Sequence, residues 1–184
     1  AIEVYKKALA AVDSTDTEQR SMFLGGMGDA QFSMGDTIGA FALYDQAIEI
    51  DPNNVSILNN YAYFLTLCNR DLDKAERMSA KTVQAEPQNA TFLDTYAWVF
   101  YKRKEYTMGQ LVIGMAIKNE RRPSSDIYDH YGDILLAVGN KQEALKQWKK
   151  ALELDAGNKE LLEKVEKLAL ELQPADTKEN TDDK

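Results

Sequence analysis

A pattern of large and small residues, with a period of about 34 residues, constrains the fold of this chain more than any other feature. The clearest copy is residues 125–158, SDIYDHYGDILLAVGNKQEALKQWKKALELDAGN. Counted from Ser125, its characteristic residues are Tyr128 at position 4, Tyr131 and Gly132 at 7 and 8, Leu135 at 11, Ala144 at 20, Trp148 at 24 and Ala151 at 27. The spacing predicts two helices, each with one apolar face, and small residues that let the two backbones approach closely. One such hairpin cannot bury both helices, so it must stack on copies of itself.

Further copies precede this unit. Full repeats are predicted at residues 21–54, 55–89 and 90–124, in the same register as 125–158. Three of the four prolines, Pro52, Pro87 and Pro123, fall near the ends of these repeats, where proline stops the second helix. Lys104 stands where other units have a glycine in the turn between the two helices.

The ends of the chain differ from full repeats. Residues 1–12 match only a second helix, with Tyr5 at position 24, so we expect a longer protein in which a first helix precedes them. Residues 13–20 are polar and predict a loop. Residues 159–172 form an amphipathic pattern that predicts a capping helix with a charged outer face. Residues 173–184 predict a flexible acidic tail.

These repeats resemble the tetratricopeptide family, and the resemblance covers residues 1–172. It implies an all-α fold: a right-handed superhelical solenoid of antiparallel helix hairpins in one domain, closed by the capping helix. The runs LNNYAYFL, LDTYAWVFY and YDHYGDILLAVG also resemble bacterial multi-repeat proteins. A bacterial source, and an envelope-associated parent protein, are the expectations that follow.

In this family the first helix of each repeat lines a concave groove that binds peptides. The resemblance assigns to this groove Asp29, Phe32, Asn59, Tyr63, Asp94, Trp98, Tyr101, Asp126, Asp129, His130 and Asp133. Tyr63 and Trp98 share position 9 and are expected to be neighbours. Aromatic rings flanked by an amide and carboxylates are suited to binding an extended peptide. Equally, the two rings could bury against adjacent first helices.

The carboxylates indicate what such a groove would bind. Some family members clamp a C-terminal carboxylate with Lys, Arg and Asn, and of the corresponding residues here only Asn59 fits. Acidic neighbours would repel a carboxylate, so a basic or apolar segment is the expected ligand. The cluster of Asp126, Asp129 and Asp133 is expected to hold its positively charged part.

Other function classes have little support. The formal net charge of −8 disfavours nucleic-acid binding, and no apolar run is long enough to span a membrane. Cys68 is the only cysteine, so the chain has no internal disulfide. Asp126, His130 and Asp133 lie on one helix face but fall short of a specific metal-ligand set. The glycines at 25, 26 and 28 lie in a helix rather than after a strand, which excludes a nucleotide loop.

We therefore predict a non-catalytic scaffold without cofactor or metal that binds another protein or peptide. One alternative is self-association, in which the apolar face of residues 1–12 packs on a second copy as a homodimer. Another is that the array is the interaction arm of a longer multidomain protein. The compartment, cytoplasmic or bacterial periplasmic, stays open.

Overall fold

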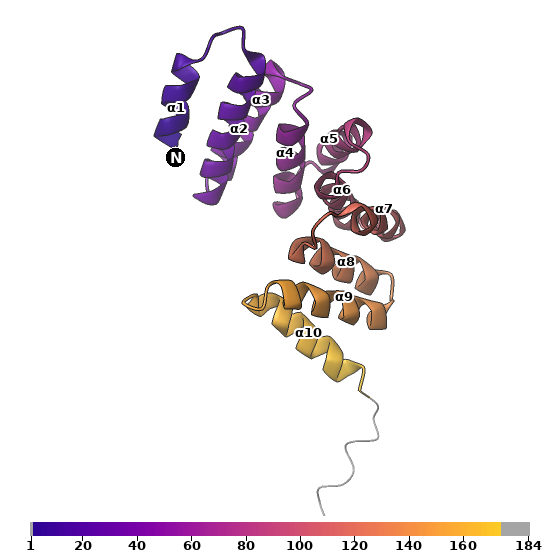
Figure 1. The fold of residues 1–184 in the computed structure, drawn as a ribbon. Helices are drawn as coiled ribbons and strands as arrows, with labels where there is room; N and C mark the ends of the chain where they lie inside the picture. Colours follow the sequence, from indigo (N-terminus) through magenta and orange to yellow (C-terminus); the bar gives the residue numbers. More distant parts are fainter. Residues whose placement is uncertain (1, 174–184) are drawn as a thin grey trace, which may run out of the picture. The chain divides into compact units, whose positions relative to one another are not determined.

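The computed structural model describes residues 2–173, and these residues form α-helices without any strand (Figure 1). Residue 1 and residues 174–184, most of the predicted acidic tail, lie outside the described part of the chain. The helices form two compact units, the first ending at Pro87 and the second beginning at Gln88. The all-α class expected from the repeat pattern is confirmed.

The first unit is built from five helices. These are α1 (Ile2–Ala11), α2 (Thr17–Ser33), α3 (Thr37–Ile50), α4 (Val55–Leu67) and α5 (Leu72–Ala85). Neighbours in sequence pack against each other, α2 on α3 and α4 on α5, while α1 packs on α2 (Figure 1). The ring of Tyr44 on α3 is fully buried and stacks on Tyr61 of α4, with ring centres 5.0 Å apart. This unit thus contains two complete hairpins and one additional helix.

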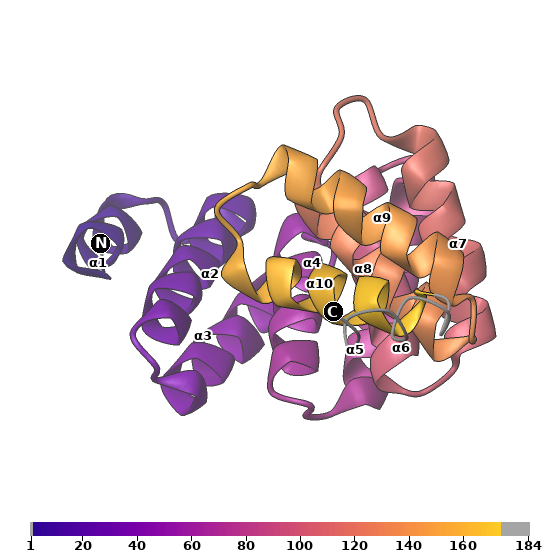
Figure 2. The same cartoon turned by 90° about the horizontal axis from the view of Figure 1, so that it is seen from below.

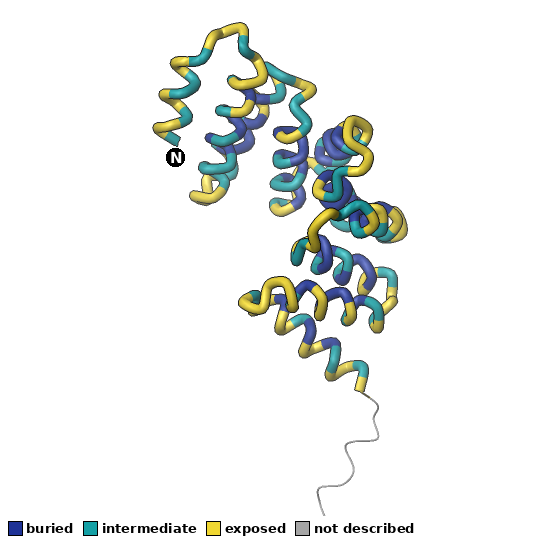
Figure 3. The backbone as a smooth tube through the Cα atoms, viewed as in Figure 1, coloured by how far each residue is buried: buried dark blue, intermediate teal, exposed yellow. Residues whose placement is uncertain are grey.

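The second unit repeats this arrangement with the additional helix at its end. Its helices are α6 (Ala90–Lys102), α7 (Tyr106–Asn119), α8 (Ser125–Ala137), α9 (Lys141–Leu154) and α10 (Lys159–Glu171). α6 pairs with α7, α8 with α9, and α10 packs on α9 (Figure 2). Tyr128, Leu135, Trp148, Leu161 and Val165 belong to the core that joins the last hairpin to α10. The dark blue faces in Figure 3 are the buried sides along which the helices of each unit pack.

Small residues set the distance between the paired helices. A Cβ placed on Gly132 would lie 2.3 Å from the indole of Trp148, so α8 and α9 could not approach this closely with a larger residue. In the same way the ring of Tyr44 covers Gly28 in the first unit, 3.0 Å from the position of such a Cβ. The large and small positions of the sequence pattern are therefore direct packing partners.

Side-chain caps fix where most helices begin. Asn54, Asn89 and Asn158 accept hydrogen bonds from backbone N–H groups at the start of α4, α6 and α10. Asp16 does the same for α2, which begins at Thr17, several residues earlier than the predicted repeat at 21. The predicted loop over residues 13–20 is therefore too long. Asp16 caps α2 and Thr17 begins it, so only residues 13–16 of the predicted loop lie outside a helix.

Candidate protein-binding site

A buried ion pair joins two first helices of the second unit. His130 Nδ1 on α8 lies 2.9 and 3.1 Å from the two carboxylate oxygens of Asp94 on α6, and both side chains are 11% exposed. Burial disfavours protonation of His130, but the Asp94 carboxylate outweighs this and raises the pKa of the imidazole. The pair therefore ties α6 to α8 at the positions that the repeat register assigns to the groove.

An aromatic stack continues from this pair along α6. The ring of Trp98 stacks on His130, with centres 4.1 Å apart, and on Tyr101, with centres 4.5 Å apart. Lys102 places its amine 5.2 Å from the centre of the Trp98 ring. Tyr101 is only half-buried, and burial followed by the nearby charge of Asp133 raises the pKa of its phenol. These contacts make one continuous surface from α6 and α8.

The indole of Trp98 has an unusual polar feature. Its side chain is buried, and its Nε1–H has no hydrogen-bond acceptor among the described residues. Buried donors are nearly always paired in folded proteins, because an unpaired one costs about 1–3 kcal/mol. An unused hydrogen-bond donor therefore lies among the packed side chains of this unit's first helices.

A lysine of the last helix joins two of the predicted aspartates. Lys164 Nζ on α10 donates to Asp129 at 2.8 Å and to both carboxylate oxygens of Asp133 at 2.9 and 3.0 Å. Trp148 Nε1 also donates to Asp133, at 3.1 Å. Burial raises the pKa of Asp133 despite the lysine, whereas the two carboxylates raise the pKa of Lys164 against the effect of its own burial. Two of the three carboxylates in the predicted cluster thus have an internal cation, and Asp126 is exposed at the start of α8.

The groove residues predicted in the first unit occupy a separate surface. Asp29 accepts a hydrogen bond from the buried hydroxyl of Tyr44, and Phe32 stacks on Phe64 with ring centres 4.1 Å apart. Asn59 is buried, and its side-chain oxygen has no hydrogen-bond partner within residues 2–173. Tyr63 is half-buried beside Phe64. These residues belong to the first unit, and Trp98 to the second.

Gly25 on α2 has no free space beside it. A Cβ on Gly25 would lie 2.2 Å from the end of the Ile57 side chain, so α4 fills this position with its own isoleucine. Gly26 is covered in the same way by the ring of Tyr5 on α1. Both glycines allow neighbouring helices to pack closely, which is sufficient reason for their presence in α2.

Sequence reasoning missed Lys164 as part of this site. The apolar stripe of α10 identified a capping helix, and the charged residues beside it were assigned to a solvated outer face. The aspartates that Lys164 contacts lie 31 and 35 residues earlier in the chain. A pairing over such a distance leaves no periodic signal, so no local pattern could have revealed it.

The structure shows no metal-ligand cluster among its described residues, where no three His, Cys, Asp or Glu side chains are suitably grouped. His130 in particular is directed at Asp94 rather than at Asp126. None of the described helices is long and apolar enough to cross a membrane.

Comparison with known proteins identifies the repeats. One tetratricopeptide-repeat model matches residues 23–54 and 125–158, and a second model of the same description matches residues 43–77. No sequence among curated proteins matches significantly. These matches identify tetratricopeptide repeats in residues 23–77 and 125–158 of the chain.

Solved structures of that class share the fold. The TPR protein TTC0263 of Thermus thermophilus superposes with a TM-score of 0.72 at 16% identity, covering 92% of this chain and 89% of its own. PilF of Pseudomonas aeruginosa gives 0.71 at 19% identity, covering 84% and 70%. YrrB, described as a TPR protein with an unusual peptide-binding site, gives 0.64 at 18% identity, covering 93% and 84%. The expected tetratricopeptide-like solenoid is therefore confirmed.

Proposed function

We propose that this chain is a non-catalytic scaffold that binds a peptide segment of another protein on the first-helix surface of its second unit. This surface consists of Trp98, Tyr101, Asp126 and His130, with Lys102 at its edge. The observation that carries the proposal is the indole N–H of Trp98, which has no acceptor within the described residues and lies in a stack with the half-exposed Tyr101. A backbone carbonyl of a bound segment would supply the missing acceptor after the side chains that cover this N–H have moved aside.

The wider class supports this use of the surface. One structural neighbour is described as having a peptide-binding site, and another, the first TPR domain of Spaghetti, as bound to an HSP90 peptide. Those ligands belong to those proteins, since identities below 20% carry the fold alone. The chemistry of the ligand has to come from the residues of this chain.

The residues favour a segment with an apolar side chain and modest positive charge. The half-buried Tyr101 offers part of its ring to an apolar side chain, whereas the ring of Trp98 is already stacked on Tyr101 and His130. Because Lys164 already pairs with Asp129 and Asp133, the exposed Asp126 is the carboxylate best placed to meet a basic residue. We therefore expect weaker selection for basic ligands than the three-aspartate cluster alone would give.

The test uses Trp98→Phe, which keeps one aromatic ring but removes the pyrrole half of the indole together with its N–H. Peptides with one leucine flanked by lysines, and matched peptides with glutamates, are titrated into the isotope-labelled chain and followed by NMR. We expect shifts on α6 and α8 with the lysine peptides, and weaker binding by Trp98→Phe and Tyr101→Ala. Leu154→Ala, at an exposed site on α9, is the matched control.

The proposal is wrong if the lysine peptides shift no resonance on α6 or α8 while circular dichroism shows a folded chain. It is equally wrong if Trp98→Phe and Tyr101→Ala bind as well as the unaltered protein.

Self-association is the alternative function that one observation favours. α1 buries no residue, and Val4 on its outer side is 69% exposed. A second copy could cover this face. Light scattering over a range of concentrations tests the idea, because a dimer that Val4→Glu abolishes would support it and a strict monomer would exclude it.

A further inference from the structure

The helix α7 differs in charge from the other second helix of its unit. Its sequence, YTMGQLVIGMAIKN, contains one charged residue, Lys118. By contrast α9, KQEALKQWKKALEL, carries lysines and glutamates along its outer side, as a solvated helix should. Because the outer side of α7 lacks these charges, its composition resembles that of a helix with a partner.

The outward side of α7 is both apolar and exposed. Leu111 is 63% exposed, Met108 46% and Met115 41%. Gly114 lies among them, and a Cβ at this position would meet no atom within 4 Å. The glycine is therefore not needed for packing within the chain, although it costs the helix about 1 kcal/mol relative to alanine. It leaves room for the backbone of another molecule to approach α7.

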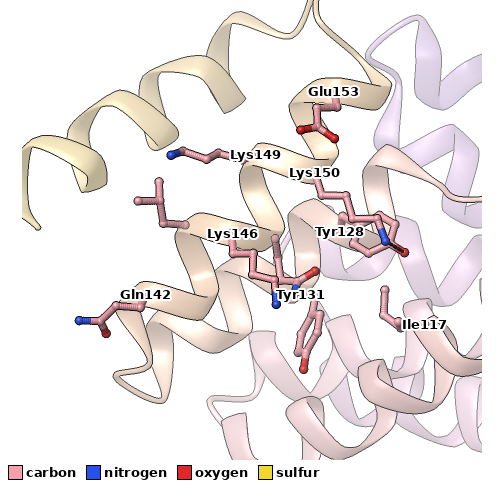
Figure 4. A pocket seen from close by; sticks show the side chains of 10 residues that line it. Ile117, Tyr128, Tyr131, Gln142, Lys146, Lys149, Lys150 and Glu153 are labelled. Carbon is pink, nitrogen blue, oxygen red and sulfur yellow. Dashed lines mark hydrogen bonds between the residues drawn. The ribbon is translucent and has the colours of Figure 1, made fainter.

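A hollow next to this side offers a second set of contacts. Its volume is about 620 Å³, and it lies over α7, α8 and α9 (Figure 4). Its lining includes Ile117, Tyr128 and Tyr131 together with Lys146, Lys149 and Lys150. Ile117 of α7 and the lysines of α9 both line the hollow, which therefore runs from α7 to α9. Apolar and cationic groups thus line the same hollow.

The lysines give this surface a charge opposite to that of the whole chain. Lys146 pairs with Glu143, and Lys150 donates to the hydroxyl of Tyr128, which in turn donates to Glu120. Lys149 is exposed and has no ion-pair partner among the described residues. With Lys118 on α7 and only Glu153 as a further acidic lining residue, the surface is cationic within a chain of net charge −8.

We propose that this surface, consisting of the outward side of α7 and the adjoining hollow, binds an acidic amphipathic segment of a partner protein. Apolar side chains of the segment cover Leu111 and Met115 and enter the hollow beside Ile117. Its carboxylates meet Lys149 and its lysine neighbours. The surface is distinct from the one on α6 and α8, so the chain would hold two segments of opposite chemistry.

A second copy of the chain is a poor occupant of this surface. Two copies meeting through α7 would bring their lysine-rich hollows together, and like charges repel. The outward side of a 14-residue helix is also about 21 Å long, which is short for a stable dimer interface. An acidic segment avoids the charge repulsion, and a single helix lying along α7 does not need the larger area of a stable dimer interface.

The test separates the apolar and the charged contribution. The probe is a fluorescent helical peptide of about 18 residues, long enough to span α7, with leucines on one face and glutamates along one edge. A matched peptide carries lysines instead of glutamates. We expect the glutamate peptide alone to bind, Leu111→Gln and Gly114→Gln each to weaken it at least about tenfold, and Lys149→Glu to weaken it several-fold. Leu170→Gln, equally exposed on α10, should have no effect.

Charge reversal provides the sharpest outcome, because Lys149→Glu should gain affinity for the lysine peptide while losing it for the glutamate peptide. Equal binding of both peptides, or unchanged binding by Leu111→Gln, would overturn the proposal. A concentration-dependent dimer lost in Leu111→Gln would assign the surface to a second copy instead. Tighter binding of a short oligonucleotide than of the glutamate peptide would also overturn it. Because all these residues lie away from Trp98 and Tyr101, the result is independent of the proposed function.

Discussion

Replacing Lys164 by methionine should destabilise the second unit, because it removes the cation that two aspartates share. Methionine keeps the length and apolar stem of lysine, so the packing of α10 changes little. Asp133 retains the hydrogen bond from Trp148 Nε1 but loses both of its bonds to the amine. Its side chain is 15% exposed, so its charge would be largely uncompensated.

The size of the effect follows from the burial of the three groups. Removing one partner of a fully buried ion pair costs about 3–5 kcal/mol, whereas an exposed pair is worth about 0–1 kcal/mol. Here the side chains of Lys164 and Asp129 are 25% and 24% exposed, between these limits. We expect Lys164→Met to lower the free energy of unfolding by about 2 kcal/mol. In the double variant with Asp133→Asn the loss should be smaller than the sum of the single losses, by about 1 kcal/mol.

Urea unfolding followed by circular dichroism measures these values, and Lys167→Met on the exposed side of α10 is the matched control. The pH dependence provides a second check. Burial raises the pKa of Asp133, so without Lys164 the carboxylate takes up a proton more readily in the folded state. The penalty should therefore shrink as the pH falls from 7 towards 4. A loss below about 0.5 kcal/mol, or one independent of pH, would refute the reasoning.

Three further predictions concern the same unit or its turns. Because Asp94 raises the pKa of His130, the stability that this pair adds should be fully present below about pH 6.5 and be lost as the pH rises through the higher folded pKa. Asp94→Asn should flatten this slope in urea midpoints measured from pH 6 to 9. Gly132→Ala should lower the free energy of unfolding by about 1–3 kcal/mol, because the added Cβ would overlap the indole ring of Trp148. Gly114→Ala should leave the stability unchanged or raise it, and calorimetry can compare the two variants. Lys104 has a φ of 65°, so Lys104→Gly should raise the free energy of unfolding by up to about 1 kcal/mol, which a higher melting temperature would show.

Much of the fold follows from the sequence because its main contacts are periodic. The spacing of Tyr128, Gly132 and Trp148 predicts one hairpin, and the structure packs these three residues against one another or into the same core. The sequence also predicts that Lys104 lies in the turn, and the structure gives this residue a positive φ like that of Gly139 in the next hairpin. Contacts that depend on size and spacing repeat in every unit, so they can be recognised from one chain.

The contacts of the candidate site are harder to predict from the sequence, because each of them occurs only once in the chain. The register places Asp94 and His130 on first helices, and the family resemblance assigns both to the peptide groove. In the structure the two side chains are buried and pair with each other, and neither could be buried in this way without the other. Lys164 is similar, because lysines on amphipathic helices usually face solvent. Helical periodicity identifies the face on which a residue lies, but not the charged group that it meets.

The contact between α10 and the last hairpin has a consequence for the modularity of the array. A generic terminal helix would need only an apolar stripe, and such helices could be exchanged among repeat proteins. Here Lys164 matches carboxylates on α8, so a repeat transplanted without α10 would carry two adjacent aspartates and no cation. A different terminal helix would need a lysine at the same place. The last repeat and α10 therefore form one structural unit, and in repeat engineering they should be moved together.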